Sequence, residues 1–252
     1  MIVKTTEEIE KIRKAGKILA QVAKTVLANV EEGKSLRSLD NLARELVKKA
    51  GAEPAFLGYQ PYGAKKPYPC SICTSVNDTV VHGVPNDYKL KSGDLLKLDF
   101  GVILDGWYAD AAWTIGVGKI SEEAEKLIKV TEKALFAGIK QAKKGNTLGD
   151  IGYAIQNLAE SHGFKVVDGL TGHGIGKKLH EDPSVFNEGK KGSGIPLQPG
   201  MVLAIEPMVS AGANKIIQKK DDSFATADKS LSAHFEHTIA ITKNGPEILT
   251  II

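Results

Sequence analysis

Five acidic and imidazole side chains lie in or beside apolar or glycine-rich segments of this sequence. They are Asp99 and Asp110 in LDFGVILDGWYADAAWT, His173 in GHGIG, Glu206 in MVLAIEPM and Glu236 in HFEHTIAIT. An ionised carboxylate is costly in apolar surroundings unless a cation neutralises it. Oxygen donors with one imidazole suit Mn, Fe, Co or Zn better than Ca or a structural zinc. Four carboxylates would balance two divalent cations, which predicts a hydrolytic centre with two metals.

The spacing of the two aspartates supports this prediction. Asp105-Gly106 is typical of a two-residue hairpin turn, which would place Asp110 opposite Gly101. Asp99 is two residues from Gly101 and therefore lies on the same face. Diagonal neighbours of this kind have Cα atoms roughly 7 to 8 Å apart, close enough for both carboxylates to share a metal or bridge two. The alternative is a solvent-exposed face on which the pair has no role.

The other three candidates come from strand-like or glycine-rich segments. Glu206 ends an apolar run, and Glu236 is expected inside a strand, on the same face as His234 and Thr238. His173 lies between glycines that let the backbone approach a ligand closely. The surrounding TGHGIGKKLHEDP is not a P-loop, because that motif requires Gly, four residues and then Gly-Lys-Ser/Thr.

Composition excludes several classes of protein. The chain has 252 residues, 42% of them hydrophobic and 25% charged, as in a globular protein of one large domain or two small ones. A net charge of +3 indicates no concentrated nucleic-acid surface. Cys70 and Cys73 are too few for a structural zinc and are expected to be reduced thiols of a cytosolic protein. The N-terminus predicts an amphipathic helix rather than a signal peptide, and no apolar run reaches the roughly 20 residues that span a bilayer.

Two capped helices suggest an internal repeat. A capping box at Thr5 begins a helix expected to continue up to Gly33, Ser35 caps a second that ends near Gly51, and helix returns from Ser121. GKSLRSLDNLARELVKKAG from Gly33 resembles GNTLGDIGYAIQNLAESHG, which lies 112 residues later. Chance similarity between two capped amphipathic helices is the alternative. A true repeat predicts two helix-plus-strand halves on one continuous sheet, with a cleft between the halves.

Five motifs together resemble the short, bacterial-type type I methionine aminopeptidases of metallopeptidase family M24. They are NDTVVHGVP, LDFGVILDGWYADAAWT, TGHGIGKKLHEDP, LAIEPM and SLSAHFEHTIAITKNGPEIL, in this order and spacing, and the resemblance covers essentially the whole chain. It implies an α/β (α+β) pita-bread fold in a single catalytic domain, residues 1–252. Pseudo-twofold halves of about 1–117 and 118–252 would surround a central antiparallel sheet. The family's metal ligands fall on the same five residues, from Asp99 to Glu236.

The resemblance also implies the reaction. The enzyme would remove the N-terminal methionine of nascent proteins and peptides by hydrolysing the first peptide bond, preferring a small second residue. A hydroxide bridging two divalent metals (Co, Mn, Fe or Zn) would attack the carbonyl, with Glu206 as ligand and general base. His82 would hydrogen-bond the substrate, and His180 would stabilise the oxyanion. The alternative for both is a loop histidine without a catalytic role.

The methionine side chain requires an apolar pocket, in which sulfur–aromatic contacts favour methionine. The residues implied to bind substrate are Phe56, Tyr59, Tyr68, Cys73, His82, His180 and Phe224. The chain departs from the common family pattern here. GYQPYGAKKPYPCSIC contains a short insertion, which leaves Tyr62 and Tyr68 as alternatives for one position, and Phe224 stands where many members have Trp.

The implied setting is a monomer in the cytoplasm, with N-terminal Met peptides and nascent chains as partners. The ribosome is a further candidate partner, and no specific nucleic acid or membrane is expected. Two rival functions remain. An X-Pro aminopeptidase or prolidase shares this catalytic fold but normally carries an added N-terminal domain. A metal-free relative would bind peptide, histone or RNA, but such relatives typically lose ligands that this chain keeps.

Overall fold

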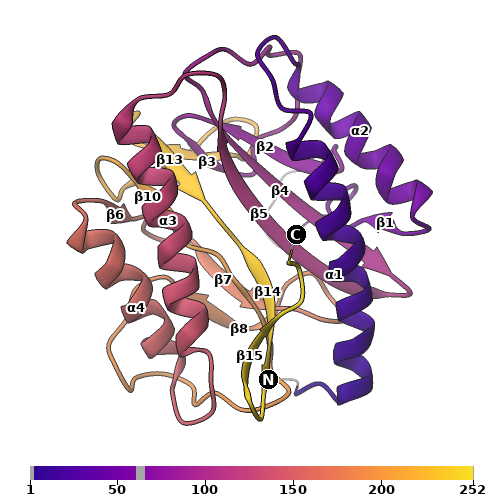
Figure 1. Cartoon of the computed structure of the whole chain (residues 1–252), viewed down its shortest axis with the longest axis vertical. Coiled ribbons are helices and arrows are strands. Elements are labelled where there is room, and N and C mark those ends of the chain that lie inside the picture. The colour runs from indigo at the N-terminus through magenta and orange to yellow at the C-terminus, as the bar shows by residue number, and fades with distance from the viewer. Residues whose placement is uncertain (1–2, 61–65, 252) are drawn as a thin grey trace.

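The computed structural model describes residues 3–60 and 66–251 of the chain. The described residues form four α-helices and fifteen strands. The helices are α1 (Thr6–Leu27), α2 (Leu36–Lys49), α3 (Glu122–Gln141) and α4 (Leu148–Ser161). Figure 1 shows α1 and α2 on one side of the molecule and α3 and α4 on the other, with the strands between them. In the described ranges, no helix combines the length and the apolar character needed to cross a membrane.

The first helix begins as predicted and ends earlier than predicted. Thr5 and Glu8 form the expected capping box. The helix ends at Leu27 rather than near Gly33. The reason is tertiary pairing: the backbone N–H of Gly33 donates to the carbonyl of Leu90 over 2.8 Å, so this segment joins a neighbouring loop. Helical propensity at the end of α1 is therefore overridden by contacts that are distant in sequence.

Helices α2 and α4 have equivalent places in the chain. Each has 14 residues, and each follows an N-cap hydroxyl residue, Ser35 for α2 and Thr147 for α4. Adding the predicted offset of 112 to the bounds of α2 gives the bounds of α4. The same offset relates two short strands, β1 (Glu53–Pro54) and β6 (Lys165–Val166). The helical pattern of the proposed repeat is thus matched in position and length by the folded elements.

The strands pair antiparallel throughout, in four hydrogen-bonded sheets rather than the one continuous sheet predicted. In the first sheet, β4 (Leu95–Leu104) pairs with β1, β2 (Ile72–Val76) and β5 (Trp107–Gly116). The five-stranded sheet has the order β15 (Gly245–Ile248), β14 (His237–Thr242), β9 (Val202–Ile205), β7 (Thr171–Gly174) and β8 (Glu181–Phe186). The two three-stranded sheets are β13 (Ser232–His234), β10 (Met208–Ser210) and β6, and β11 (Ile216–Gln218), β12 (Phe224–Thr226) and β3 (Thr79–Val81).

The β4–β5 hairpin has the predicted register. Asp105 and Gly106 form its turn, both with positive φ, at 50° and 74°. Such angles are those of the turn that matches the twist of a two-residue hairpin. Gly101 lies opposite Asp110, as the spacing required. Asp99 lies opposite Ala112, so only small side chains separate the two aspartates.

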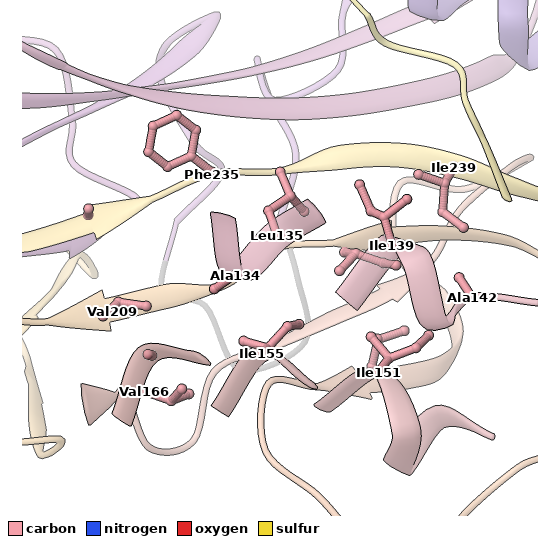
Figure 2. Packing of buried hydrophobic residues seen from close by; sticks show 14 of the residues in the cluster. Ala134, Leu135, Ile139, Ala142, Ile151, Ile155, Val166, Val209, Phe235 and Ile239 are labelled. Atoms are coloured by element: carbon pink, nitrogen blue, oxygen red, sulfur yellow. The ribbon is translucent and has the colours of Figure 1, made fainter. Parts of the chain in front are cut away.

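Each helix pair covers a core of its own. Helices α1 and α2 pack on the apolar residues of β4 and β5. Helices α3 and α4 pack on each other and on strands of the second half, and Figure 2 labels Leu135, Ile151, Ile155 and Ile239 in that cluster. Burying an aliphatic side chain of this size stabilises the fold by about 1.5 to 3 kcal/mol. The two cores fix the positions of the strands that lie between the helix pairs.

Candidate metal centre

One cavity of about 1430 Å³ is lined by every residue predicted for the site. These are Phe56, Tyr59, Tyr68, Cys73, His82, Asp99, Asp110, His173, His180, Glu206, Phe224 and Glu236. Tyr62, the alternative to Tyr68, lies outside the described residues. The fold therefore brings together side chains that span most of the length of the chain.

The five candidate metal ligands come from both halves of the chain. Asp99 and Asp110 lie on β4 and β5, His173 lies on β7, and Glu206 directly follows β9. Glu236 is not inside a strand, as was predicted, but in the break between β13 and β14. The apolar pattern continues through this break, which is why the sequence indicated a single strand.

Backbone pairing across the two halves explains the break. The N–H of Glu236 donates to the carbonyl of Ala112 over 2.9 Å, and the N–H of Ala112 donates back over 3.3 Å. Glu236 is thereby paired with β5 of the first half instead of with a neighbour in its own sheet. Phe235, beside it, is buried in the α3–α4 core (Figure 2). The two contacts fix the backbone on either side of the Glu236 side chain.

Two threonines extend this junction on either side. The hydroxyl of Thr238 accepts from the N–H of Asp110 over 2.9 Å and donates to the carbonyl of Asp110 over 2.8 Å. The hydroxyl of Thr114 makes the same pair of bonds with His234, at 2.9 and 2.7 Å. Each threonine completes the backbone hydrogen bonding of a residue whose side chain belongs to the ligand cluster. The halves are thus joined at the positions from which the polar side chains project.

His173 has the orientation of a metal ligand. Its Nδ1 lies 2.9 Å from the carbonyl oxygen of Gly174, to which it donates, so the lone pair is on Nε2. That Nε2 lies 3.8 Å from Asp110 Oδ2 and 3.5 Å from Glu206 Oε1. Ligand atoms of Asp110, His173 and Glu236 all lie within 4.8 Å of one another. A second group with the same spacing consists of Glu206, His234 and Glu236.

Within residues 3–60 and 66–251, no lysine or arginine forms an ion pair with a carboxylate of this cluster. Burial raises the pKa of Asp99 to about 7 and that of Glu206 to about 8. Burial, reinforced by neighbouring carboxylates, also raises the pKa of Asp110 and of Glu236 well above the ordinary range. Among the described residues, one carboxylate oxygen of each of Asp99, Asp110 and Glu236 is buried without a hydrogen-bond partner. A cation fits this donor set, because it would supply the missing charge and fill the missing contacts.

His180 is held by an aromatic neighbour. The hydroxyl of Tyr59 lies 2.7 Å from His180 Nδ1, and the rings of His180 and His173 meet edge to face, 4.4 Å apart. Burial lowers the pKa of His180 and raises that of Tyr59. The phenol therefore stays protonated and is able to donate to Nδ1; in the tautomer that accepts this bond, the neutral imidazole carries its proton on Nε2. This is the arrangement that an oxyanion donor requires.

His82 lines the same cavity and directly follows β3. Its φ is +60°, in the left-handed region that most side chains avoid. Its ring meets Phe224 edge to face, with the centroids 5.8 Å apart. Backbone strain of this kind persists only where the surroundings impose it, and it is concentrated at functional sites.

The remaining predicted pocket residues form an apolar wall. The rings of Phe56 and Tyr68 meet edge to face at 6.5 Å, and the Tyr68 hydroxyl donates to the carbonyl of Gly83 over 2.8 Å. Cys73 is 5% exposed, and burial raises the pKa of its thiol well above the ordinary range. Cys70 and Cys73 are both buried free thiols. The wall is thus apolar and aromatic, and the hydroxyl of Tyr68 is turned toward the backbone.

Sequence reasoning missed His234 as a member of the cluster. It placed His234 on the same face as Glu236 but gave it no role. The signal was present, because an imidazole two residues before a candidate ligand on the same face projects in the same direction. The sequence also gave no sign of the threonine bonds at the junction, since these depend on pairing between the two halves.

Comparison with known proteins decides the family. The sequence pattern that defines metallopeptidase family M24 matches residues 10–243 of the chain. The chain belongs to this family. A metallopeptidase requires a metal, and the buried ligand cluster provides for one, so this M24 member uses a divalent metal cofactor.

Individual M24 relatives agree with this assignment over the whole chain. The methionine aminopeptidase of Clostridium perfringens is 50% identical over 254 residues, covering 100% of this chain and 99% of the relative. The crystal structure of methionine aminopeptidase from Rickettsia prowazekii matches with a TM-score of 0.95 and 42% identity, covering 100% of both chains. The prolidase of Pyrococcus horikoshii matches with a TM-score of 0.79 and 27% identity, covering 99% of this chain and 63% of that chain. The predicted pita-bread fold is confirmed by these structures.

Proposed function

We propose that this chain is a methionine aminopeptidase, which hydrolyses the first peptide bond of proteins and peptides that begin with methionine. The observation that carries the proposal is the cluster of buried, unneutralised carboxylates at one end of an apolar cavity. High identity to methionine aminopeptidases over the full length supports the same substrate class. A preference for a small second residue forms part of the proposal.

In this proposal, five ligands would hold two divalent ions, drawn from Mn, Fe, Co and Zn. The ligands are Asp99, Asp110, His173, Glu206 and Glu236. When bound, such ions polarise the substrate carbonyl and lower the pKa of water. Glu236 supports the dinuclear arrangement, because it belongs to both groups of converging ligand atoms.

The residues of the chain have separate roles in the reaction. Glu206, whose side chain is 12% exposed toward the cavity, accepts the proton of the attacking water and transfers it to the leaving amine. His180, fixed by Tyr59, donates from Nε2 to the oxyanion that forms at the carbonyl. His82 hydrogen-bonds the scissile amide. Phe56, Tyr59, Tyr68, Cys73 and Phe224 enclose the methionine side chain.

The runner-up function is that of an X-Pro peptidase. It is favoured by the fold shared with prolidases, but the identity to the prolidase is lower than to the methionine aminopeptidases. Turnover of Met-Ala-Ser and of Ala-Pro, measured with added Mn or Co and again after chelation, separates the two. We expect release of methionine that chelation abolishes. Cleavage of Ala-Pro without release of methionine would establish the prolidase function. Peptide binding that survives chelation, without turnover, would establish a binding module instead.

The organisation of the protein belongs to the same proposal. Residues 1–252 form a single catalytic domain whose halves, about 1–117 and 118–252, both supply ligands. The enzyme acts as a monomer in the cytoplasm, on nascent chains leaving the ribosome. Sedimentation of the purified protein tests the monomeric state. Cosedimentation with ribosomes tests whether the protein binds the ribosome. Dimerisation would contradict the first, and failure to cosediment would contradict the second.

A further inference from the structure

His234 is a buried imidazole beside the metal centre that lies outside the five proposed ligands. The residue is 1% exposed. Neither of its ring nitrogens has a hydrogen-bond partner within residues 3–60 and 66–251. A buried polar side chain in a folded protein is almost always satisfied by a partner, so a ring nitrogen that faces Glu206 without one requires an explanation.

The ring is directed at the ligand cluster. His234 Nε2 lies 3.4 Å from Glu206 Oε2. Ligand atoms of Glu206, His234 and Glu236 all lie within 4.8 Å of one another. The 3.4 Å separation is longer than the 2.7 to 3.2 Å typical of an N–H···O hydrogen bond. It leaves room for a third atom that would contact both groups.

We propose that His234 is a sixth ligand of the metal centre and binds, through Nε2, a divalent cation that Glu206 and Glu236 also hold. This inference rests on the proposed function, because it concerns the same centre. It adds a nitrogen donor to a site for which the sequence indicated one imidazole only.

The junction between the halves supports this assignment independently. Thr114 bonds both backbone groups of His234, just as Thr238 bonds both backbone groups of Asp110. The two arrangements flank the central Ala112–Glu236 pair at equal spacing. His234 therefore occupies, on its own segment, the place that Asp110 occupies on β5. The side chains of Asp110, His234 and Glu236 therefore project from the same face of this backbone pairing.

The chemistry of the ring fits a ligand. A neutral imidazole has a ring-nitrogen lone pair that can bind a metal ion. A neutral ligand adds a bond without adding charge to a cluster that already has four carboxylates. A second imidazole also moves the preference of a mainly oxygen site from Mn toward Zn and Co.

Labelling with ¹⁵N-histidine tests the proposal on the unmodified protein. The chain has six histidines, so the ring-nitrogen spectrum is small enough to assign. On addition of Zn²⁺ to the metal-free protein, we expect metal-bound Nε2 shifts for His173 and His234. A shift at His173 alone would overturn the sixth ligand and leave the metal centre intact. Failure of Zn²⁺ to bind at all would overturn the proposed function itself.

Metal affinity provides the second test. The variant His234→Gln keeps a polar side chain of similar size but removes the imidazole. We expect the Zn²⁺ affinity of one site to fall by at least about 10-fold. Even the mutation of a residue that only orients a metal ligand typically has an effect of this size. Mn²⁺ affinity should fall less, so the Zn-to-Mn preference decreases. The matched control is His162→Gln, at the C-cap of α4, and should change neither affinity.

Circular dichroism of both variants establishes that they are folded, and the labelling test does not depend on either variant. Unchanged Zn²⁺ affinity in folded His234→Gln would overturn the proposal.

Discussion

The two halves of the molecule supply ligands in different ways. In the first half, Asp99 and Asp110 project from a regular hairpin of two ten-residue strands with unbroken register. In the second half the ligands lie at irregularities. The register of β7 shifts around His173, β9 ends directly before Glu206, and the strand is broken at Glu236.

This difference teaches where a sheet can hold reactive groups. A regular hairpin sets the direction of its side chains by alternation alone. A broken strand turns a side chain in a direction that alternation does not give, and other parts of the protein must then fix its backbone. Here Ala112 and Thr114 do so from the first half, through hydrogen bonds to the backbones of Glu236 and His234.

The largest expected effect comes from removing one ligand from each half. Asp99→Ala and Glu206→Ala should both lose metal affinity. At saturating metal, Glu206→Ala should remain about 10²- to 10⁴-fold less active than Asp99→Ala, because Glu206 also transfers the proton. Metal content and turnover of Met-Ala-Ser, measured over a range of metal concentrations, check this. If both variants regain the same turnover at saturating metal, Glu206 is a ligand only and does not transfer the proton.

The two histidines of the cavity walls give the next comparison, again one from each half. His180→Ala should lower kcat by about 10²- to 10³-fold, as expected for the loss of an oxyanion donor. His82→Ala should also lose most turnover while retaining metal. Tyr59→Phe should reproduce part of the His180 effect, because it removes the bond that orients the ring. If the fraction of protein that binds metal falls together with activity in either histidine variant, that histidine belongs to the metal centre instead.

The junction threonines provide a smaller effect on stability. Thr238→Val and Thr114→Val keep the side-chain shape but leave two buried backbone groups without a partner. Each should lower the free energy of unfolding by about 1 to 3 kcal/mol for each group left unpaired. Urea denaturation of the metal-free variants measures this, with Thr25→Val as the control, because the Thr25 hydroxyl bonds only within α1 and lies far from the junction in sequence. If the threonine bonds are dispensable, the junction variants will unfold at the same urea concentration as the control.

The smallest effect should distinguish the equivalent helices α2 and α4. Ser35 Oγ accepts from the N–H of Ser38 over 3.2 Å, whereas the Thr147 hydroxyl donates to Asp150. Ser35→Ala should cost about 0.5 to 2 kcal/mol, the usual value of an N-cap. Thr147→Ala should cost less, because the Asp150 carboxylate still accepts from the Thr147 N–H. Thermal unfolding checks the order, and a larger loss for Thr147→Ala would reverse this interpretation. Activity should not change in either variant.

The sequence determined the parts of the protein that depend on local spacing. The turn at Asp105-Gly106 set the register of the hairpin, and caps at Thr5, Ser35 and Ser121 set the starts of three helices. The five candidate ligands were chosen because charged groups in apolar segments are costly unless neutralised. Such features follow from interactions between residues a few positions apart, which one sequence displays directly.

Only the tertiary structure decided the rest. The early end of α1, the break at Glu236 and the orphaned ring of His234 all result from contacts between segments far apart in the chain. The carbonyl of Leu90 accepts a hydrogen bond from Gly33 in the segment after α1, and the backbone of Ala112 pairs with the backbone of Glu236. Alternation and helical period describe a segment by itself, so they cannot show where a distant backbone offers a better hydrogen-bond partner. The irregular half of the metal centre depends on such partners.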